Sequence, residues 1–479
     1  RVPSNSRKES LSVGDGNANA AVILQSRNKN KKPLQSAKEK KKASTALSTS
    51  SSTSSSIPNT KTITALNFAT HDYLGMSCPA PNASSDKITN STSDNAGNNS
   101  TVPNYADDPV KYASQKALSK YGCGSCGPRG FYGTIDAHLH LEEAMAEFTS
   151  TEEAILYSDG ATTAASTIAA FAKRGDLLVV DEGVYEALGT GVTLSRANVK
   201  YFQHNDMKDL RRVLKRVQAK DESLGRKRND QRRFIVVEGL YKNYGTICPL
   251  KELVKLKQEF SYRLILDESF SFGALGKTGR GALEHFGLKA MVDAEILIIS
   301  MENALGSIGG VTVGNNEVVD HQRLSGAGYC FSASSPPFLA DAARASLARM
   351  KSQPGLVEEL AEKVRYFYHK VEEVMKDIVP KKVIITSQKD LSPIVFFQLT
   401  KQEDRRLLLS REEQVDLLEK VSEECLDRGV FLISTGRHVY HHLHRVPPPA
   451  LRLTIMNKQS KEEINMAVGV LKKAIDANV

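Results

Sequence analysis

The stretch that decides the fold is "LILDESFSFGALGKTGRGALEHFG", Leu264 to Gly287, together with "ILIISMENALGSIGGVTVGN", Ile296 to Asn315. Each begins with a short apolar run of the kind that forms a buried strand, and each continues into a glycine-rich turn. In the second stretch the polar turn holds Glu302 and Asn303. Many enzymes carry a catalytic lysine in such a turn, but this turn has none. The pattern therefore indicates a buried strand, a polar turn and a glycine-rich return, and it raises the question of what such a turn does without a lysine.

Short apolar runs alternate with helical patterns on both sides of this stretch. The runs include "DLLVVDE", "RRFIVVEGL" and "YRLILDES", and the helical patterns include "MKDLRRVLKRVQ" and "PLKELVKLKQEF". Strands that are apolar on both faces and separated by helices are typical of a parallel sheet covered by helices. We therefore predict an α/β fold whose large domain has a mostly parallel sheet flanked by helices.

The chain divides into four parts by composition. Residues 1–60 form a basic, serine-rich leader that we expect to be disordered. Residues 61–106 form an N-terminal segment with a low-complexity insertion at 79–103. Residues 107–335 contain the alternating pattern of the large domain. Residues 336–479 begin with a long helical region and continue with apolar runs such as "PIVFFQL" and "ALRLTIM", which predicts a smaller C-terminal α/β domain.

The net charge of +9 is concentrated in the leader. Residues 1–60 hold 11 Lys or Arg and 3 Asp or Glu, so the remaining residues are almost neutral. The basic tail is compatible with an anionic membrane or nucleic acid, and with a solvated leader, which we favour. We do not read the charge as evidence for nucleic-acid binding by the folded part. The sequence also has no apolar run of membrane-spanning length.

Neither the cysteines nor the glycosylation sequons indicate a functional site. The pair Cys123 and Cys126 matches a C-x-x-C pattern, but no second ligand pair lies beside it, so we favour a backbone turn over a metal or redox site. We therefore predict no metal. Sequons occur at Asn82, Asn90 and Asn99, in an Asn/Ser/Thr-rich run that generates them by chance, and we expect no glycosylation.

Eight motifs in order give the chain a specific resemblance. They are "NFATHDYLG", "YGCGSCGPRGFYGTIDAHLHLEE", "LVVDE", "QHND", "VVEGLY", "LDESFSFGALGKTGRG", "NALGSIGG" and "FSASSPP". Over residues 62–478 the chain resembles the α-oxoamine synthases, fold type I pyridoxal-phosphate enzymes that join an amino acid to an acyl-CoA. Within that family it is most similar to the long-chain-base subunits of eukaryotic serine palmitoyltransferase. The resemblance implies a fold type I aminotransferase-like architecture.

The resemblance also implies which site residues are altered. The family places its pyridoxal-phosphate lysine where this chain has Asn303, and an amide nitrogen cannot condense with an aldehyde. The family histidine that contacts the cofactor's phenolic oxygen is Phe270 here, and phenylalanine has no donor. Tyr185 stands where the family has the histidine that stacks on the pyridine ring. We therefore predict no catalytic residue in this chain.

Other residues of the family's site are retained, and each has more than one possible role. Asp267 corresponds to the partner of the pyridine nitrogen, and we favour the interpretation that it is vestigial and pairs locally. Arg452 remains from a substrate-binding arginine pair, of which the other member is Ala450. His138 lies near the family's dimer core, where helix packing is at least as good an explanation as catalysis.

Active sites of the family lie at subunit interfaces, which implies a role for this chain beside a lysine-bearing partner. The resemblance assigns Ser332, and with less weight Ser334, to the phosphate of pyridoxal 5'-phosphate bound covalently by the partner. Cys126, Arg129 and Tyr132 are predicted at the substrate entrance or the interface, or as interface residues alone. The glycines around them permit close approach of the backbone.

The hypothesis is thus a non-catalytic subunit of serine palmitoyltransferase, which condenses L-serine with palmitoyl-CoA to 3-ketosphinganine in sphingolipid synthesis. It would form a heterodimer with the catalytic subunit, share its site for acyl-CoA and serine, and bind small membrane regulators. The resemblance places it at the endoplasmic reticulum membrane, facing the cytosol, with an anchor helix that this sequence lacks. One alternative is an active homodimer that uses another lysine, of which Lys277 is nearest in sequence. The other is a scaffold without an active-site role.

Overall fold

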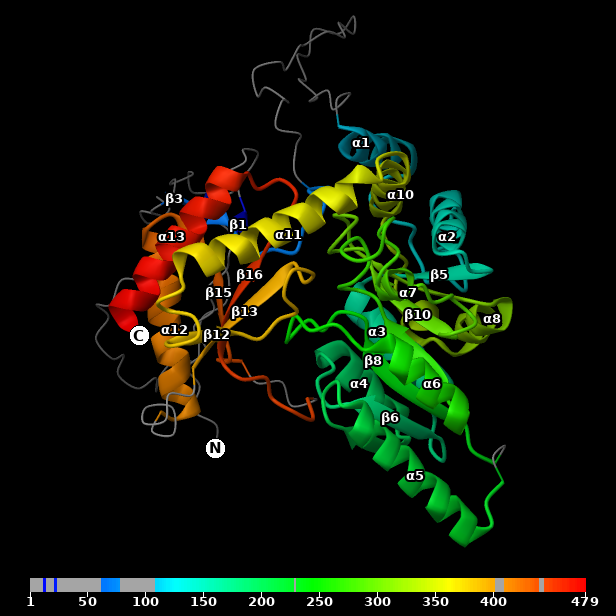
Figure 1. Cartoon of the computed structure of the whole chain (residues 1–479). Helices are drawn as coiled ribbons and strands as arrows, with labels where there is room; N and C mark the ends of the chain where they lie inside the picture. The colour runs from blue at the N-terminus through cyan, green and yellow to red at the C-terminus, as the bar shows by residue number, and fades with distance from the viewer. Residues whose placement is uncertain are drawn as a thin grey trace, which may run out of the picture.

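A seven-stranded sheet forms the centre of the large domain (Figure 1). The strand order is β5-β11-β10-β9-β8-β6-β7. Strand β11 is antiparallel to both of its neighbours, and the other adjacent strands are parallel. The strands are β5 (Glu153–Tyr157), β6 (Leu177–Asp181), β7 (Asn198–Phe202), β8 (Arg233–Glu238), β9 (Arg263–Asp267), β10 (Ile296–Ser300) and β11 (Gly310–Gly314). The sheet confirms the predicted mostly parallel architecture.

The computed structural model describes residues 12–13, 21–23, 62–77, 108–227, 230–400, 409–438 and 443–479. The sequons and the 79–103 insertion lie outside these residues. Every residue of β6, β10 and β11 is buried, which is why their sequences are apolar on both faces. Within the described part of the chain, no helix is long and apolar enough to cross a membrane.

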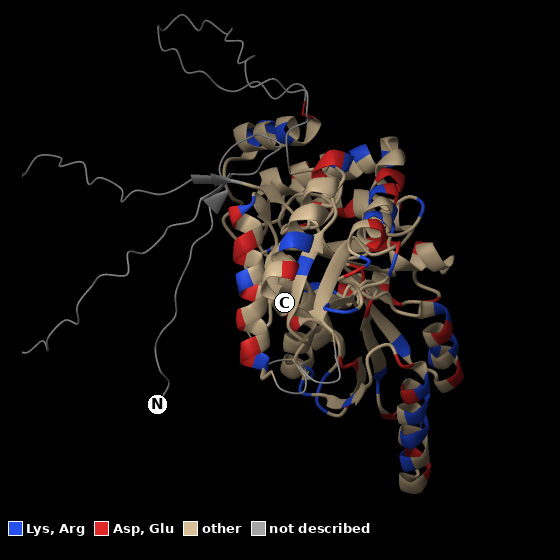
Figure 2. Cartoon of the chain, turned by 60° about the vertical axis from the view of Figure 1, so that its left-hand side comes forward, with Lys and Arg blue, Asp and Glu red and all other residues tan. Residues whose placement is uncertain are grey.

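Helices flank the sheet and begin at residues that suit helix starts. Asp108, Asp159 and Asp206 each cap a helix by accepting hydrogen bonds from backbone N–H groups of its first turn. Charges of both signs line the long helix α5 (Figure 2). The helices of this domain are α1 (Pro109–Tyr121), α2 (Asp136–Thr149), α3 (Gly160–Phe171), α4 (Glu186–Ser195), α5 (Met207–Leu224), α6 (Leu250–Phe260), α7 (Ala282–Phe286), α8 (Asn316–Ser325) and α9 (Ala327–Phe331).

The C-terminal domain has an antiparallel sheet in the order β12-β13-β16-β15. Its strands are β12 (Val383–Ile385), β13 (Ile394–Leu399), β15 (Ile433–Thr435) and β16 (Ala450–Thr454). Helices α11 (Gly355–Val374), α12 (Arg411–Asp427) and α13 (Lys461–Asn478) pack together beside it (Figure 1). In addition, β4 (Leu66–Asn67) pairs in parallel with β14 (Val430–Phe431), so the N-terminal segment joins this domain.

Helix α10 (Pro337–Ser352) packs against α1 and α2 of the large domain. The helix therefore packs with the large domain although it follows the boundary that we place between residues 335 and 336, and α11 leads into the smaller domain (Figure 1). The exact boundary stays a prediction.

Part of the leader pairs with the N-terminal segment. Strands β1 (Ser12–Val13) and β2 (Ala21–Ile23) form an antiparallel sheet with β3 (Thr62–Thr64). We expected disorder throughout residues 1–60. The structure differs from this expectation at β1 and β2, which are paired strands. Their apolar and β-branched residues favour pairing although the surrounding composition is polar. The rest of the leader lies outside the described residues.

Candidate functional site

The turn that carries Asn303 follows the carboxyl end of β10, beside the end of β9. Ligands of open α/β sheets bind at this edge. The Asn303 side chain is 6% exposed, and its Nδ2 donates a hydrogen bond of 2.8 Å to the backbone oxygen of Ser269. Its backbone oxygen accepts from the N–H of Tyr73 at 3.0 Å. Asn303 is thus held by the loop after β9 and by the N-terminal segment.

Asp267, the last residue of β9, is buried and fully engaged within its own chain. Its Oδ1 accepts from the N–H of Ser269 at 2.8 Å, and its Oδ2 accepts from the hydroxyl of Tyr185 at 3.0 Å. Burial raises the pKa of Asp267 to about 6, and these hydrogen bonds oppose part of that rise. The carboxylate therefore has local partners in place of a ligand.

Three aromatic rings gather beside Asp267. The ring of Phe270 lies edge-on to Tyr185, with centroids 5.8 Å apart, and edge-on to His71, with centroids 5.4 Å apart. Burial, followed by the positive charges of Arg452 and Lys242, holds the pKa of His71 well below its usual value. Its Nε2 has no partner within the part of the chain that the structure describes. This neutral imidazole comes from the N-terminal segment and not from either stretch that decides the fold.

Lys242, and not Lys277, is the lysine beside these rings. The Lys242 ammonium lies 5.4 Å from the centroid of the Tyr185 ring and 3.0 Å from a carboxylate oxygen of Glu186. Lys277 is exposed in the loop after β9. The Lys242 side chain is thus held by the Glu186 carboxylate.

The amino end of α3 is occupied by the carboxylate of Asp159. This carboxylate accepts from the N–H of Thr162 at 2.7 Å and from its hydroxyl at 2.5 Å. It thereby supplies the negative charge that a helix N-terminus attracts. The adjacent Ser158 hydroxyl lies 3.2 Å from the hydroxyl of Ser332.

Two segments meet next to this helix end. We call residues 123–134 the glycine loop and residues 331–335 the serine segment. Pro128 and Ala333 form an antiparallel bridge between them. The N–H of Ser334 donates to the oxygen of Gly127 at 3.0 Å, and the Ser334 hydroxyl lies 2.9 Å from that oxygen and 2.7 Å from the oxygen of Gly133. The serine segment thus fixes the glycine loop.

The two candidate serines differ in what they can reach. Ser334 is buried, and its hydroxyl is committed to the glycine loop. Ser332 is only partly buried, and the neighbouring Phe331 is 82% exposed. Ser332 is therefore the serine that can contact another molecule.

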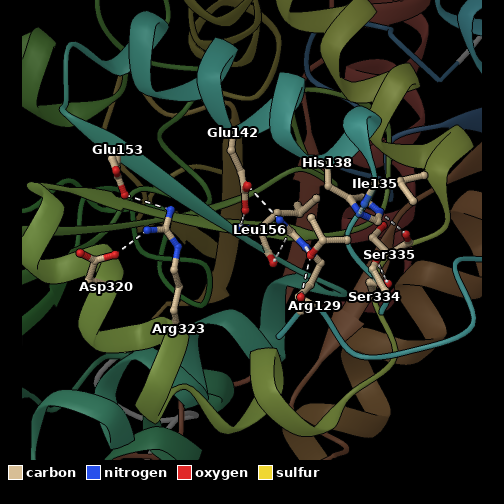
Figure 3. Close-up of polar contacts among 12 residues, drawn as sticks. Arg129, Ile135, His138, Glu142, Glu153, Leu156, Asp320, Arg323, Ser334 and Ser335 are labelled. Carbon is tan, nitrogen blue, oxygen red and sulfur yellow. Dashed lines mark hydrogen bonds and ion pairs between the residues drawn. The ribbon is translucent and has the colours of Figure 1, made fainter. Parts of the chain in front are cut away.

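The residues predicted at the substrate entrance differ in their exposure to solvent. Tyr132 is 93% exposed, and Cys126 is exposed with a left-handed φ of 61°. Arg129, in contrast, is 5% exposed, and its guanidinium is bound inside the protein to Glu142 and to the backbone oxygen of Leu156 (Figure 3). We therefore do not retain Arg129 as a substrate contact. Glycine-rich sequence around it suggested exposure, but a carboxylate from α2 draws the side chain inward.

His138 connects α2 to the serine segment. It is fully buried, its Nε2 lies 2.7 Å from the oxygen of Ser335, and its Nδ1 lies 3.3 Å from the N–H of Ile135 (Figure 3). Nδ1 is thus the acceptor and Nε2 the donor of a neutral imidazole, and burial lowers its pKa. This is a packing role. Arg452 likewise donates to the backbone oxygen of Ala69, at 2.9 Å.

The described residues contain no group of three or more His, Cys, Asp or Glu that could hold a metal ion. Cys123 and Cys126 are free and exposed. Cys126, with its left-handed backbone, lies in a turn of the glycine loop.

Glu268, next to Asp267, gives the site a testable pH dependence. Burial raises the pKa of Glu268 to about 7, although its carboxylate accepts from the N–H groups of Ala282 and Leu283. The folded chain therefore binds this proton more tightly than the unfolded chain. The resulting stability is present below pH 4 to 5 and is lost as pH rises through about 7. For Glu268 the loss amounts to about 3 kcal/mol.

We therefore expect the thermal midpoint to fall between about pH 5 and about pH 8, and to fall less in Glu268→Gln, which stays neutral. Glu259→Gln, which alters an exposed ion pair with Arg211, is the control. Parallel midpoint curves for the wild-type chain and Glu268→Gln would contradict the assignment.

Comparison with known proteins agrees with this fold. The family model "Aminotransferase class I and II" matches residues 98–471. A serine palmitoyltransferase from S. paucimobilis, solved with a pyridoxal-phosphate–myriocin aldimine, superposes with a TM-score of 0.70 over 87% of this chain and 89% of that chain. At 23% sequence identity this likeness shows the fold alone. The chain belongs to the aminotransferase class I and II family, with the fold type I architecture of pyridoxal-phosphate enzymes.

Two curated relatives narrow the position within that family. "Serine palmitoyltransferase 1" from Dictyostelium discoideum is 39% identical, over 76% of this chain and 74% of the relative. "Long chain base biosynthesis protein 1" from Arabidopsis thaliana is 39% identical, over 74% of this chain and 70% of the relative. The chain is thus a relative of the first subunits of serine palmitoyltransferase, as the sequence motifs predicted.

Sequence reasoning missed several residues of the site. Glu142 holds Arg129, Lys242 lies beside the Tyr185 ring, His71 packs its ring against Phe270, and Asp159 occupies the end of α3. The N-cap position of Asp159 was visible in "SDGATT". The other three carry no local signal, because each meets its partners through packing of distant segments.

Proposed function

We propose that this chain is the non-catalytic subunit of a serine palmitoyltransferase. In this proposal a lysine-bearing partner holds pyridoxal 5'-phosphate and condenses L-serine with palmitoyl-CoA to 3-ketosphinganine. This chain stabilises the partner and completes its site from across the interface. A location at the endoplasmic reticulum membrane, with the synthase body facing the cytosol and small membrane regulators bound, belongs to the same proposal.

The observation that carries the proposal is Asn303 and its bond to Ser269. The Asn303 amide nitrogen is delocalised into its carbonyl and donates to the Ser269 backbone oxygen at 2.8 Å. No change of rotamer or of protonation makes an amide act as an amine. The position that the family uses for its lysine therefore cannot link the cofactor.

The residues around Asn303 also fit pyridoxal phosphate poorly. When bound to an enzyme, the group supplies an electron sink for carbanions. Here the Tyr185 hydroxyl donates a hydrogen bond to the Asp267 carboxylate, and the Phe270 ring offers no hydrogen-bond donor. The Asp159 carboxylate at the end of α3 repels a phosphate. We therefore assign the cofactor to the partner and derive no step through it in this pocket.

The contribution of this chain would come from the glycine loop and the serine segment. Together they present exposed side chains, above all Tyr132 and Phe331, and the partly exposed hydroxyl of Ser332. Exposed aromatic residues on a fixed loop are suited to an interface core. Ser332 is the proposed donor to the partner's cofactor phosphate, while Ser334 supports the loop.

The test compares the chain alone with the chain beside its partner. The purified chain is incubated with pyridoxal phosphate, reduced with borohydride and analysed by mass spectrometry. We expect no lysine adduct, and none after Asn303→Lys, because Tyr185 still binds Asp267 and the Asp159 carboxylate still occupies the amino end of α3. Co-expression with a lysine-bearing homologue should give a stable heterodimer with synthase activity that neither chain shows alone.

Two outcomes would favour the alternatives. A reduced adduct on Lys242 or Lys277 in the isolated wild-type chain would indicate an active homodimer. A stable heterodimer whose activity equals that of the lysine-bearing chain alone would indicate a scaffold. Lys242→Ala is the matched variant for the first outcome, since this amine lies beside the Tyr185 ring.

A further inference from the structure

A buried ion pair lies beneath the exposed tip of the glycine loop. The Nη2 of Arg129 is 2.9 Å from Oε2 of Glu142, and the two side chains are 3% and 11% exposed. Burial of two charges is costly unless their remaining hydrogen-bonding groups are also satisfied. Apolar packing could anchor the loop without that cost. The presence of an ion pair in its place therefore calls for a physical reason, and the direction that its hydrogen bonds impose supplies one.

Both members of the pair make further directional contacts. The second carboxylate oxygen of Glu142 accepts from the N–H of Leu156 at 2.7 Å. Arg129 donates from Nε to the hydroxyl of Thr134 at 3.0 Å and from Nη1 to the oxygen of Leu156 at 3.3 Å. Its guanidinium also faces the ring of Tyr329 at 5.3 Å. The pair therefore joins the glycine loop to α2 and β5 (Figure 3), and the Tyr329 ring adds a contact with α9.

The tip above this anchor is exposed. Phe131 and Tyr132, two and three residues after Arg129, are 69% and 93% exposed. A turn supports them, because the N–H groups of Phe131 and Gly133 both donate to the oxygen of Pro128. The direction of the tip consequently depends on the position of Arg129 inside the protein.

We propose that Arg129 and Glu142 are positioning residues, which fix the glycine loop and through it the placement of Tyr132 at the partner's acyl-CoA site. Neither residue touches a substrate. The inference rests on the proposed function, since it requires a partner whose site the loop completes. A guanidinium suits this task because its planar donors set a direction as well as a distance.

A nearby exposed pair provides a matched control. Arg323 contacts Glu153 at 3.0 Å, with side chains 41% and 34% exposed, and it keeps a second partner in Asp320 (Figure 3). Glu153 lies on β5, the strand that also carries Leu156. Exposed pairs contribute little, so Glu153→Gln should change neither the loop nor the kinetics.

The test variant is Glu142→Gln. The introduced amide keeps the shape of the side chain and can still accept from Leu156, but it lacks the charge that holds Arg129. Glu142→Asp restores the charge at a shorter reach. Hydrogen exchange is measured on the full chain, with and without the lysine-bearing subunit, and KM for acyl-CoA and kcat are measured on the complex.

In Glu142→Gln we expect exchange at the N–H groups of Gly133 and Ser334 to rise about tenfold, with the sheet unaffected. We expect KM for acyl-CoA to rise about fivefold, with kcat within about twofold of wild type. Glu142→Asp should recover part of both changes, and Glu153→Gln should match wild type. A uniform rise in exchange across the chain would instead indicate a merely structural role and overturn the proposal.

Failure of the positioning role and failure of the proposed function can be told apart. If the loop loosens in Glu142→Gln but KM and kcat stay at wild-type values in an active complex, positioning is wrong and the subunit function stands. If the wild-type chain adds no activity to its partner, the subunit function is wrong and the positioning role falls with it. Unchanged exchange in Glu142→Gln would overturn the anchor itself.

Discussion

Replacing Ser332 with tryptophan is expected to lower the activity of the complex by roughly a hundredfold while leaving the heterodimer intact. Ser332 lies in the serine segment, its hydroxyl 3.2 Å from that of Ser158 at the amino end of α3. If the proposed function is correct, an indole at this position, beside the exposed Phe331, would intrude on the partner's site. Displacement of reacting groups by about 1 Å can cost about a hundredfold in rate.

Two control variants separate the effect of bulk from that of the hydroxyl. Ser332→Ala removes only the hydroxyl, and if this group donates to the partner's phosphate, the cofactor should bind about tenfold more weakly. Ser352→Trp places the same indole on the exposed end of α10, at the other end of that helix from the serine segment, and should be neutral. Wild-type rates for Ser332→Trp in an intact complex would remove the serine segment from the partner's site.

Gly133→Val is expected to have the second large effect, through the glycine loop. A Cβ at position 133 would lie 1.9 Å from the backbone oxygen of Gly127 and 2.7 Å from the hydroxyl of Ser334. Since the nearer atom belongs to the backbone of the same loop, the glycine loop must open, and the Ser334 hydroxyl that binds it must also move. Overpacking of this kind costs about 2 kcal/mol or more, and the displaced loop should reduce activity about a hundredfold.

The matched control lies in the same loop. A Cβ at Gly124 meets no atom within 4 Å, so Gly124→Ala should behave as wild type. The measurements are the thermal midpoint of the chain, the mass of the complex and its synthase rate. Retention of full activity by Gly133→Val would show that contact between the two segments is not needed at the partner's site.

The predicted effects of Ser332→Trp and Gly133→Val both arise in the segments that the proposed function places at the partner interface. The polar groups at Asn303 are engaged within the chain, since Tyr185 binds Asp267 and Asn303 binds Ser269. Three exposed aromatic side chains, those of Phe131, Tyr132 and Phe331, lie instead in the glycine loop and the serine segment. In this proposal the pocket stabilises the fold, and the two loops act on the partner.

The sequence alone determined the fold class, the chemical limits of two site residues and the family. The apolar runs on both sides of Asn303 specified a mostly parallel sheet, because strands buried on two faces have no polar side to present. The chemical limits of Asn303 and Phe270 are equally local. An amide is not an amine and a phenyl ring has no hydrogen-bond donor, in any fold. The eight motifs in order were enough to indicate the family.

Only the tertiary structure decided how these residues are used. The partners of Arg129, Asp267 and His138 lie 13, 82 and 197 residues away along the chain, in Glu142, Tyr185 and Ser335. A local pattern reports which face of its own helix or strand a residue occupies, but not which distant segment packs against that face. Arg129 therefore looked like a surface residue in a glycine-rich loop. The buried carboxylate that reverses this interpretation exists at that place only because α2 packs beneath the loop.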